Sequence, residues 1–383
     1  MRILLVGEFS RLHNSLQEGL QALGHNVILV NNGDGFKNFP ADISINARFF
    51  KSKIGNIVRQ IWYRVFKFDL ALLEHGIRFW WHLSKFKNFD VVQLINEKPI
   101  QTEARLEYYL LKKLFKHNKN IFLLCSGVDY VTFTYMLQKK ERYSILNAYF
   151  ENIKDAKKQY EFMFDYLTKS HQKIHQFLYQ NIKGVIASDL DYVNPLLGNK
   201  KFLGMIPNPI NLDKIKFNPM QEINRITIFL GINSGNSYKK GIQYFEKALQ
   251  IIKEKYPNEI DIIITTDIPY NEYVAYFEKA TIVLDQVFAY DQGYNALEAM
   301  AKGKVVFTGA EIEFLEYYNL KEDEVAINAL PSVNYLVEKL SFLIENPSKI
   351  NEISANAQKF IQQEHHYIES AKKYLAVWQK KSA

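Results

Sequence analysis

The chain has 383 residues, of which 48% are hydrophobic and 23% are charged, a balance typical of a globular protein and not of a disordered or fibrous one. The length suggests two or three domains. A single cysteine, Cys125, excludes a disulfide framework and a thiolate zinc site, and it fits a reducing compartment. The longest apolar runs fall short of the roughly 18 residues of a membrane-spanning helix.

The charge is distributed unevenly along the chain. The net charge is +7, but residues 1–205 hold 29 basic and 18 acidic side chains, whereas residues 206–383 hold 19 and 23. The basic excess is greatest in segment 51–89, where eight Lys and Arg residues accompany two acidic residues and several aromatic ones, among them Trp62, Trp80 and Trp81. Three interpretations remain open: core helices with basic rims, contact with an anionic membrane surface, or nucleic-acid binding. Because no nucleic-acid motif accompanies the segment, we do not expect a nucleic-acid partner.

The first half of the chain alternates between buried strands and amphipathic helices. A short apolar run at 2–6 predicts a strand, because it is too short for the core of a signal peptide. Leucines at helical spacing between Ser10 and Gly24 predict a helix, which a second strand at 27–30 follows. The remaining elements expected in this half are strands at 90–95, 120–125 and 184–188 and helices at 102–116 and 151–180. This β-α-β order predicts a parallel sheet.

Pro207 and Pro209 flank Asn208 and break both helix and strand, which marks this segment as the linker between two domains. The alternation then restarts, with strands expected at 226–230, 260–265, 281–284 and 305–308, helices at 241–255, 271–279 and 294–301, and a helical tail from 333. We therefore expect two doubly wound α/β domains that face a cleft. The first comprises 1–205 together with a C-terminal helix at about 366–383, and the second comprises 206–365. Ligands bind at the carboxyl ends of the strands in such folds.

Segment 285–309 has the sequence pattern of an anion site. Gly293 precedes a helix that has Asn295 in its first turn and Glu298 one turn further on. The unpaired N–H groups and the dipole of a helix start favour bound phosphate. Glu298 is surrounded by apolar residues, and a charge in such surroundings needs a partner, such as a ribose hydroxyl.

The loop 231–241, GINSGNSYKKG, follows a strand and ends with Lys239 and Lys240 before a helix. A strand, a glycine-containing loop and lysines before a helix suit a pyrophosphate. The spacing differs from that of a P-loop, and two solvated surface lysines remain the alternative.

Taken together, these residues resemble the GT-B glycosyltransferases of family 4 type over nearly the whole chain. IPNPIN at 206–211 is similar to the family's interdomain segment, and Lys240-Gly241 is similar to its phosphate-binding Lys-Gly pair. GYNALEAMAKGKVV, from Gly293 on, is similar to the second half of its two-glutamate signature. The resemblance implies the GT-B fold and the transfer of a sugar from a nucleotide donor, without a metal ion or another cofactor.

The resemblance also implies roles for individual residues. Glu298 is expected to bind the ribose, and Lys240 is expected to stabilise the leaving diphosphate. Tyr290 occupies the position of the first glutamate of the family signature. The expected catalytic residues are therefore Lys240, Glu298 and Tyr290. The remaining residues expected to bind the donor are Gly231, Asn233, Lys239, Asp291, Gly293, Tyr294 and Asn295. Two positions depart from the family pattern. Tyr290, which precedes Asp291, replaces a glutamate, and Asn233 replaces an arginine. The contacts with the donor at these two positions must therefore differ from those of the family.

On the acceptor side we expect Gly7, Glu8 and Arg11 after the first strand, and Ser126 and Asp129 after Cys125. Ser126 or Asp129 would replace a histidine that the family often has there. His13 is an alternative to Arg11 for contact with an acidic acceptor.

The sequence therefore predicts a cytoplasmic glycosyltransferase with a nucleotide-sugar donor and a glycan or lipid-linked acceptor, acting in surface-polysaccharide synthesis. Segment 51–89 would hold it at the inner membrane face. Two alternatives remain open: a nucleotide-sugar 2-epimerase of the same fold, and a catalytically silent nucleotide-binding subunit.

Overall fold

The computed structural model describes residues 1–217 and 225–382 and divides the chain into two compact units. Unit 1 comprises 1–134, 163–209 and 367–383, and unit 2 comprises 135–162 and 210–366. The domain boundary expected after residue 205 lies close to Pro209, where the second segment of unit 1 ends. The assignment of 135–162 to unit 2 differs from the sequence expectation, because this segment packs on elements that follow Pro209.

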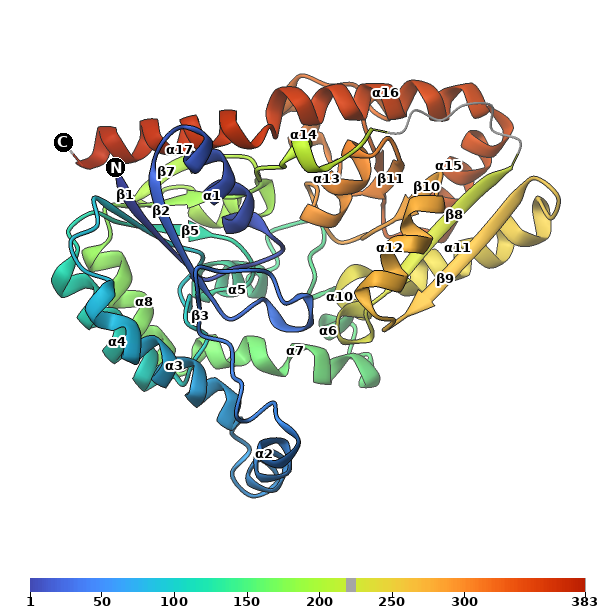
Figure 1. The fold of residues 1–383 in the computed structure, drawn as a ribbon. Helices are drawn as coiled ribbons and strands as arrows, with labels where there is room; N and C mark the ends of the chain where they lie inside the picture. Colours follow the sequence, from blue (N-terminus) through green and yellow to red (C-terminus); the bar gives the residue numbers. More distant parts are fainter. Residues whose placement is uncertain (218–224, 383) are drawn as a thin grey trace. The chain divides into compact units, whose positions relative to one another are not determined.

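Unit 1 is built on a parallel seven-stranded sheet in the order β3-β2-β1-β4-β5-β6-β7 (Figure 1). Its strands are β1 (Arg2–Val6), β2 (Asn26–Asn31), β3 (Ile43–Ser44), β4 (Val91–Leu94), β5 (Ile121–Cys125), β6 (Gly184–Ala187) and β7 (Phe202–Met205). The strand order reverses between β1 and β4, so the carboxyl ends of these two strands form the topological switch point of the unit.

Helices cover both faces of this sheet. On one face, α1 (Leu12–Ala22) and α17 (Tyr367–Ser382) share an apolar core with β1 and β2, and Trp378 donates a buried hydrogen bond to Gln93. On the other face lie α3 (Leu70–His82), α4 (Ala104–His117) and α8 (Lys169–Asn181). The remaining helices of unit 1 are α2 (Lys53–Phe66), α5 (Tyr130–Leu137), which continues into unit 2, and α9 (Val193–Leu196).

Unit 2 has a parallel five-stranded sheet in the order β12-β11-β10-β8-β9. Its strands are β8 (Ile226–Ile232), β9 (Ile260–Thr266), β10 (Ile282–Leu284), β11 (Val305–Thr308) and β12 (Ile327–Asn328). Its helices are α6 (Asn147–Phe150), α7 (Lys157–Phe164, which ends in unit 1), α10 (Ser237–Lys240), α11 (Ile242–Lys255), α12 (Tyr270–Lys279), α13 (Tyr294–Ala301), α14 (Ile312–Tyr318), α15 (Val333–Glu345) and α16 (Pro347–Glu364). The switch point lies between β8 and β10.

The doubly wound pattern of both units confirms the α/β fold expected from the sequence. The single long helix expected at 151–180 is wrong, because the chain forms α7 and α8 with a break at 165–168, where Thr168 caps the start of α8. The short polar Thr side chain satisfies an amide at a helix start, which favours a new helix over a continuous one.

Candidate functional site

The switch point of unit 2 brings together the two segments that the sequence analysis selected. Lys240 ends α10, and its Nζ donates a hydrogen bond of 2.8 Å to Asp285 Oδ1 directly after β10. Asn295, in the first turn of α13, donates to the same oxygen at 3.1 Å. Asp285 therefore holds the lysine head group next to the start of α13.

Close backbone approaches fix this arrangement. The amide of Val287 donates to the carbonyl of Lys240 at 2.8 Å, which ties the loop after β10 to the end of α10. Gly241 has a φ of +69° and lies so close that a Cβ would meet Val287 Cβ at 2.8 Å. A side chain at Gly241 would be strained in this conformation and would push the two loops apart.

The start of α13 is suited to an anion. Gly293 occupies the N-cap position and has no side chain with which to cap the helix. Tyr273 from α12 donates to Asn295 Oδ1 at 2.9 Å and lies against Gly231 at the end of β8. The Lys240 ammonium group, paired with the Asp285 carboxylate, and the positive end of the helix dipole lie together at this edge of the sheet.

The other predicted donor residues lie in different surroundings. Asn233 caps the short turn at 234–236 through its side-chain oxygen. The Nζ of Lys239 lies 4.7 Å from the centre of the Phe162 ring, and burial lowers the pKa of Lys239 to about 8. Glu298 and Tyr294 are half-buried on α13.

Tyr290 is the predicted residue whose position argues most strongly against direct contact with a donor. Its side chain is 4% exposed, and its hydroxyl accepts a hydrogen bond from the Arg142 amide at 2.9 Å. The Arg142 guanidinium lies 4.9 Å from the ring centre and forms ion pairs with Glu311 and Glu313. Neighbouring Asp291 is also buried and accepts from the Gln292 amide. A catalytic role for Tyr290 remains a prediction.

Sequence reasoning did not single out Asp285, although its side chain is only 2% exposed and it joins the two predicted segments. The available signal was its position immediately after an apolar strand. A cavity of about 200 Å³ lies within segment 136–151, and none of the predicted donor residues lines it. In the described ranges 1–217 and 225–382, no group of three or more His, Cys, Asp and Glu side chains is placed to hold a metal ion.

The predicted acceptor residues of unit 1 follow β1 and β5. Glu8 is completely buried, and its carboxylate accepts hydrogen bonds from the amides of His13 and Asn14 at the start of α1. Arg11 forms an ion pair with Glu18 at 2.8 Å, and Gly7 has a φ of +88°. These contacts give Glu8 and Arg11 internal structural partners, and their contact with an acceptor remains a prediction.

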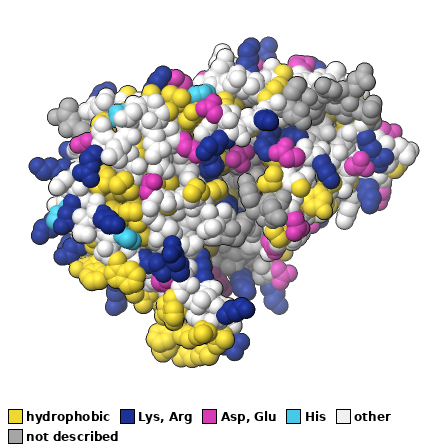
Figure 2. All heavy atoms as spheres, viewed as in Figure 1, with side chains coloured by type: hydrophobic (Ala, Val, Ile, Leu, Met, Phe, Trp, Pro, Cys, Tyr) yellow, Lys and Arg dark blue, Asp and Glu magenta, His cyan; other side chains and the backbone are white. Residues whose placement is uncertain are grey.

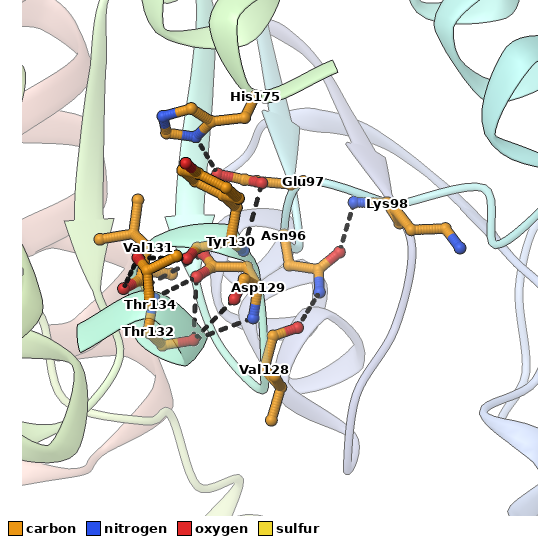
Figure 3. Close-up of polar contacts among 11 residues, drawn as sticks. Asn96, Glu97, Lys98, Val128, Asp129, Tyr130, Val131, Thr132, Thr134 and His175 are labelled. Carbon is orange, nitrogen blue, oxygen red and sulfur yellow. Dashed lines mark hydrogen bonds and ion pairs between the residues drawn. The ribbon is translucent and has the colours of Figure 1, made fainter. Parts of the chain in front are cut away.

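Asp129 and Glu97 are two buried carboxyl groups that lie close enough to interact (Figure 3), and Ser126 is also buried. Asp129 accepts hydrogen bonds from the amide and hydroxyl of Thr132, and Glu97 forms a 2.7 Å contact with Nδ1 of His175. Burial, reinforced by the neighbouring Asp129 charge, raises the pKa of Glu97 to about 7. Because Asp129 is fully buried and caps α5, the structure gives it an internal role. Sequence reasoning missed the pair of Glu97 and His175, which lie 78 residues apart.

We expect Glu8 to make the stability of unit 1 pH-dependent. Burial raises its pKa from 4.5 to about 7, so folded Glu8 binds a proton that the unfolded chain releases. Its contribution to stability is complete below pH 4.5 and is lost as the pH rises toward 7, a change of about 3 kcal/mol. Glu8→Gln should remove this part of the pH dependence.

The measurement is urea unfolding at several pH values, followed by the fluorescence of the four tryptophans, all of which lie in unit 1. The same substitution at exposed Glu254 serves as the control. If Glu8→Gln kept the slope of the parent protein, Glu8 would not be the titrating group.

Comparisons with known proteins agree with this fold. Residues 236–376 match the model of a family described as glycosyl transferase-like. No curated protein sequence matches the chain.

Several solved structures resemble it over nearly their full length. Sucrose-phosphate synthase from Thermosynechococcus elongatus has 13% identity and a TM-score of 0.60, with 99% of this chain and 98% of that chain covered. HepE from Anabaena, in complex with UDP and glucose, has 12% identity and a TM-score of 0.58, with 99% of this chain and 100% of that chain covered. A putative UDP-N-acetylglucosamine 2-epimerase from Listeria monocytogenes has 11% identity and a TM-score of 0.53, with 98% of this chain and 94% of that chain covered.

The fold class of the protein follows from the sheet topology and the similar solved structures. The chain has the GT-B fold, and its residues 236–376 are similar to the glycosyl transferase-like family. The matched range includes Lys240, Asp285 and the whole of α13.

Proposed function

We propose that this protein is a glycosyltransferase that moves a sugar from a nucleotide-sugar to a hydroxyl group of a glycan or lipid-linked acceptor. The observation that best supports this proposal is that Lys240 and Asn295 both donate hydrogen bonds to Asp285 at the start of α13. This arrangement supports a diphosphate site, because a cation and a helix N-terminus converge on one point. The UDP bound to HepE is consistent with a nucleotide donor here.

In the proposed reaction, the bond between the sugar C1 and the diphosphate oxygen breaks, and a bond forms between C1 and the acceptor oxygen. The acceptor proton passes to a phosphate oxygen of the donor, so no strong protein base is required. Lys240 and the α13 start stabilise the charge that develops on the departing diphosphate, as preorganised electrostatics do at other sites. We propose that the reaction retains the anomeric configuration, needs no metal ion and serves surface-polysaccharide synthesis in the cytoplasm.

The first test is a thermal-shift panel of UDP, GDP and ADP with their sugars. A ligand at a hundred times its Kd should stabilise the folded protein by about 2.7 kcal/mol. Products are then followed by NMR with and without acceptor. Transfer that requires an acceptor supports the proposal. Conversion of one nucleotide-sugar into another without an acceptor would identify an epimerase. Nucleotide binding without turnover would identify a catalytically silent subunit.

Glu298→Ala should weaken nucleotide binding about ten- to a hundredfold, because a lost hydrogen bond to a charged group costs about 1.5–3 kcal/mol. Glu298 lies one turn into α13, and we propose that it accepts a hydrogen bond from the ribose of the donor. Isothermal titration with the nucleoside diphosphate measures the change, and Glu246→Ala on the exposed face of α11 is the control. Unchanged affinity in Glu298→Ala would remove Glu298 from the site.

A further inference from the structure

Helix α2 has an unusually exposed apolar surface. Of its 14 residues, only Gly55 is buried. Ile54 is 75% exposed and Val65 is 68% exposed, and the other large exposed side chains of the helix are Ile57, Val58, Ile61, Trp62, Tyr63 and Phe66. Figure 2 shows apolar side chains gathered at the tip of unit 1 where Figure 1 places α2. Apolar patches of this kind mark interaction surfaces.

The apolar residues of α2 form one stripe. Residues 54, 57, 58, 61 and 65 recur at helical spacing, and Asn56 and Gln60 lie on the opposite side. Lys53 and Arg64 fall beside Ile57 at one edge of this stripe. Long basic side chains at the edge of an apolar stripe can place their charge in the headgroup region of a lipid layer while the stripe is buried.

The charge facing outward from this segment is positive. Residues 48–67 contain six Lys and Arg residues and no Asp or Glu. Asp69, the first acidic residue beyond them, is held by Arg59 through two hydrogen bonds of 2.6 Å and caps α3.

Glu74, the other acidic residue of segment 51–89, is also bound internally. Its carboxylate accepts hydrogen bonds from the amides of Arg48, Phe49 and Phe50 and pairs with Arg78. These bonds lower its pKa to about 2. The carboxylates therefore fix the base of the segment and leave its other basic residues uncompensated.

Exposed aromatic side chains are also found on α3, which contacts α2. Trp80 and Trp81 are 53% and 61% exposed. Tryptophan is enriched at membrane–water interfaces because its ring is apolar and its N–H is polar.

We propose that residues 48–81 dock on an anionic lipid bilayer, with the apolar stripe of α2 buried at the level of the headgroups. Anionic lipid supplies both the apolar layer and the negative charge that this surface lacks. A second copy of the chain would place the same basic segments against each other, with no acidic partner in 48–67. Within the described part of the chain, no helix is long and apolar enough to cross a membrane, so the contact is with one leaflet. This proposal does not depend on the transferase activity.

The experiment mixes the full chain with phosphatidylcholine vesicles that contain or lack phosphatidylglycerol and records tryptophan emission. Trp62, Trp80 and Trp81 are exposed, whereas Trp378 is buried, so insertion should shift the emission to shorter wavelength. We expect the shift with phosphatidylglycerol at low salt and a weaker one at high salt. Co-sedimentation gives the affinity.

Ile61→Asp should weaken binding at least about tenfold, because it removes one buried apolar side chain and adds a negative charge. Ile251→Asp, at an exposed isoleucine of α11, should bind as the parent does. Replacing Lys53 and Arg64 together by Gln should weaken binding about thirtyfold, whereas Lys247 and Lys253, exposed on α11, should tolerate the same change.

The absence of binding to anionic vesicles at low salt would overturn the proposal, and so would equal binding by Ile61→Asp and the parent protein. A second result would also overturn the proposal. Analytical ultracentrifugation without lipid would show a dimer that Ile61→Asp dissociates, and the parent protein would not bind vesicles.

Discussion

Replacing Lys240 by alanine should lower turnover about 10²- to 10³-fold and weaken nucleoside diphosphate binding about tenfold or more. The lysine Nζ lies at the start of α13, where it can meet the charge that develops on the leaving diphosphate. Removal of one preorganised donor to such a charge costs about 3–4 kcal/mol in other enzymes.

Steady-state kinetics with the best nucleotide-sugar of the panel and titration with its diphosphate measure the two effects. Lys247→Ala, on the exposed surface of the next helix, removes the same charge away from the site and should change neither quantity. If Lys240→Ala kept the turnover of the parent protein, the lysine would have no part in the reaction.

Asp285→Asn should act in the opposite direction on affinity. The substitution removes a negative charge beside the proposed diphosphate, so binding of the nucleoside diphosphate should tighten about three- to tenfold. It also loosens the contact that orients Lys240 and Asn295, so turnover should fall about ten- to a hundredfold. Asp285 is thus a positioning residue.

The separation of the two effects distinguishes positioning from general destabilisation, which would lower affinity and turnover together. Asp261→Asn, at an exposed aspartate of β9 in the same sheet, is the matched control. Thermal melting of both variants shows whether they fold. Weaker nucleotide binding by a folded Asp285→Asn would contradict the assignment.

The sequence was informative where the decisive interactions are local. Strands, helices and the start of α13 at Tyr294 follow from apolar periodicity and from Gly293, and the structure has them close to the expected positions. Lys240 and Gly241 could be singled out from the strand, loop and helix pattern and from the resemblance to the family's Lys-Gly pair, and the structure places Gly241 at positive φ.

Contacts between distant parts of the chain could not be read from local patterns. Asp285 meets a lysine 45 residues earlier, and Tyr290 is bonded to an amide 148 residues earlier. Whether a carboxylate after a strand faces a ligand or caps a helix depends on the turn that follows. At Glu8 that turn places Ser10 and Arg11 at positive φ and directs the amides of α1 toward the carboxylate.

The most direct test of the account is a crystal structure of the protein with a nucleoside diphosphate that stabilises it. We predict the diphosphate within hydrogen-bonding distance of Lys240 Nζ and of the first backbone amides of α13. Side chains filling the space before Tyr294, or a nucleotide bound away from Lys240, would contradict it.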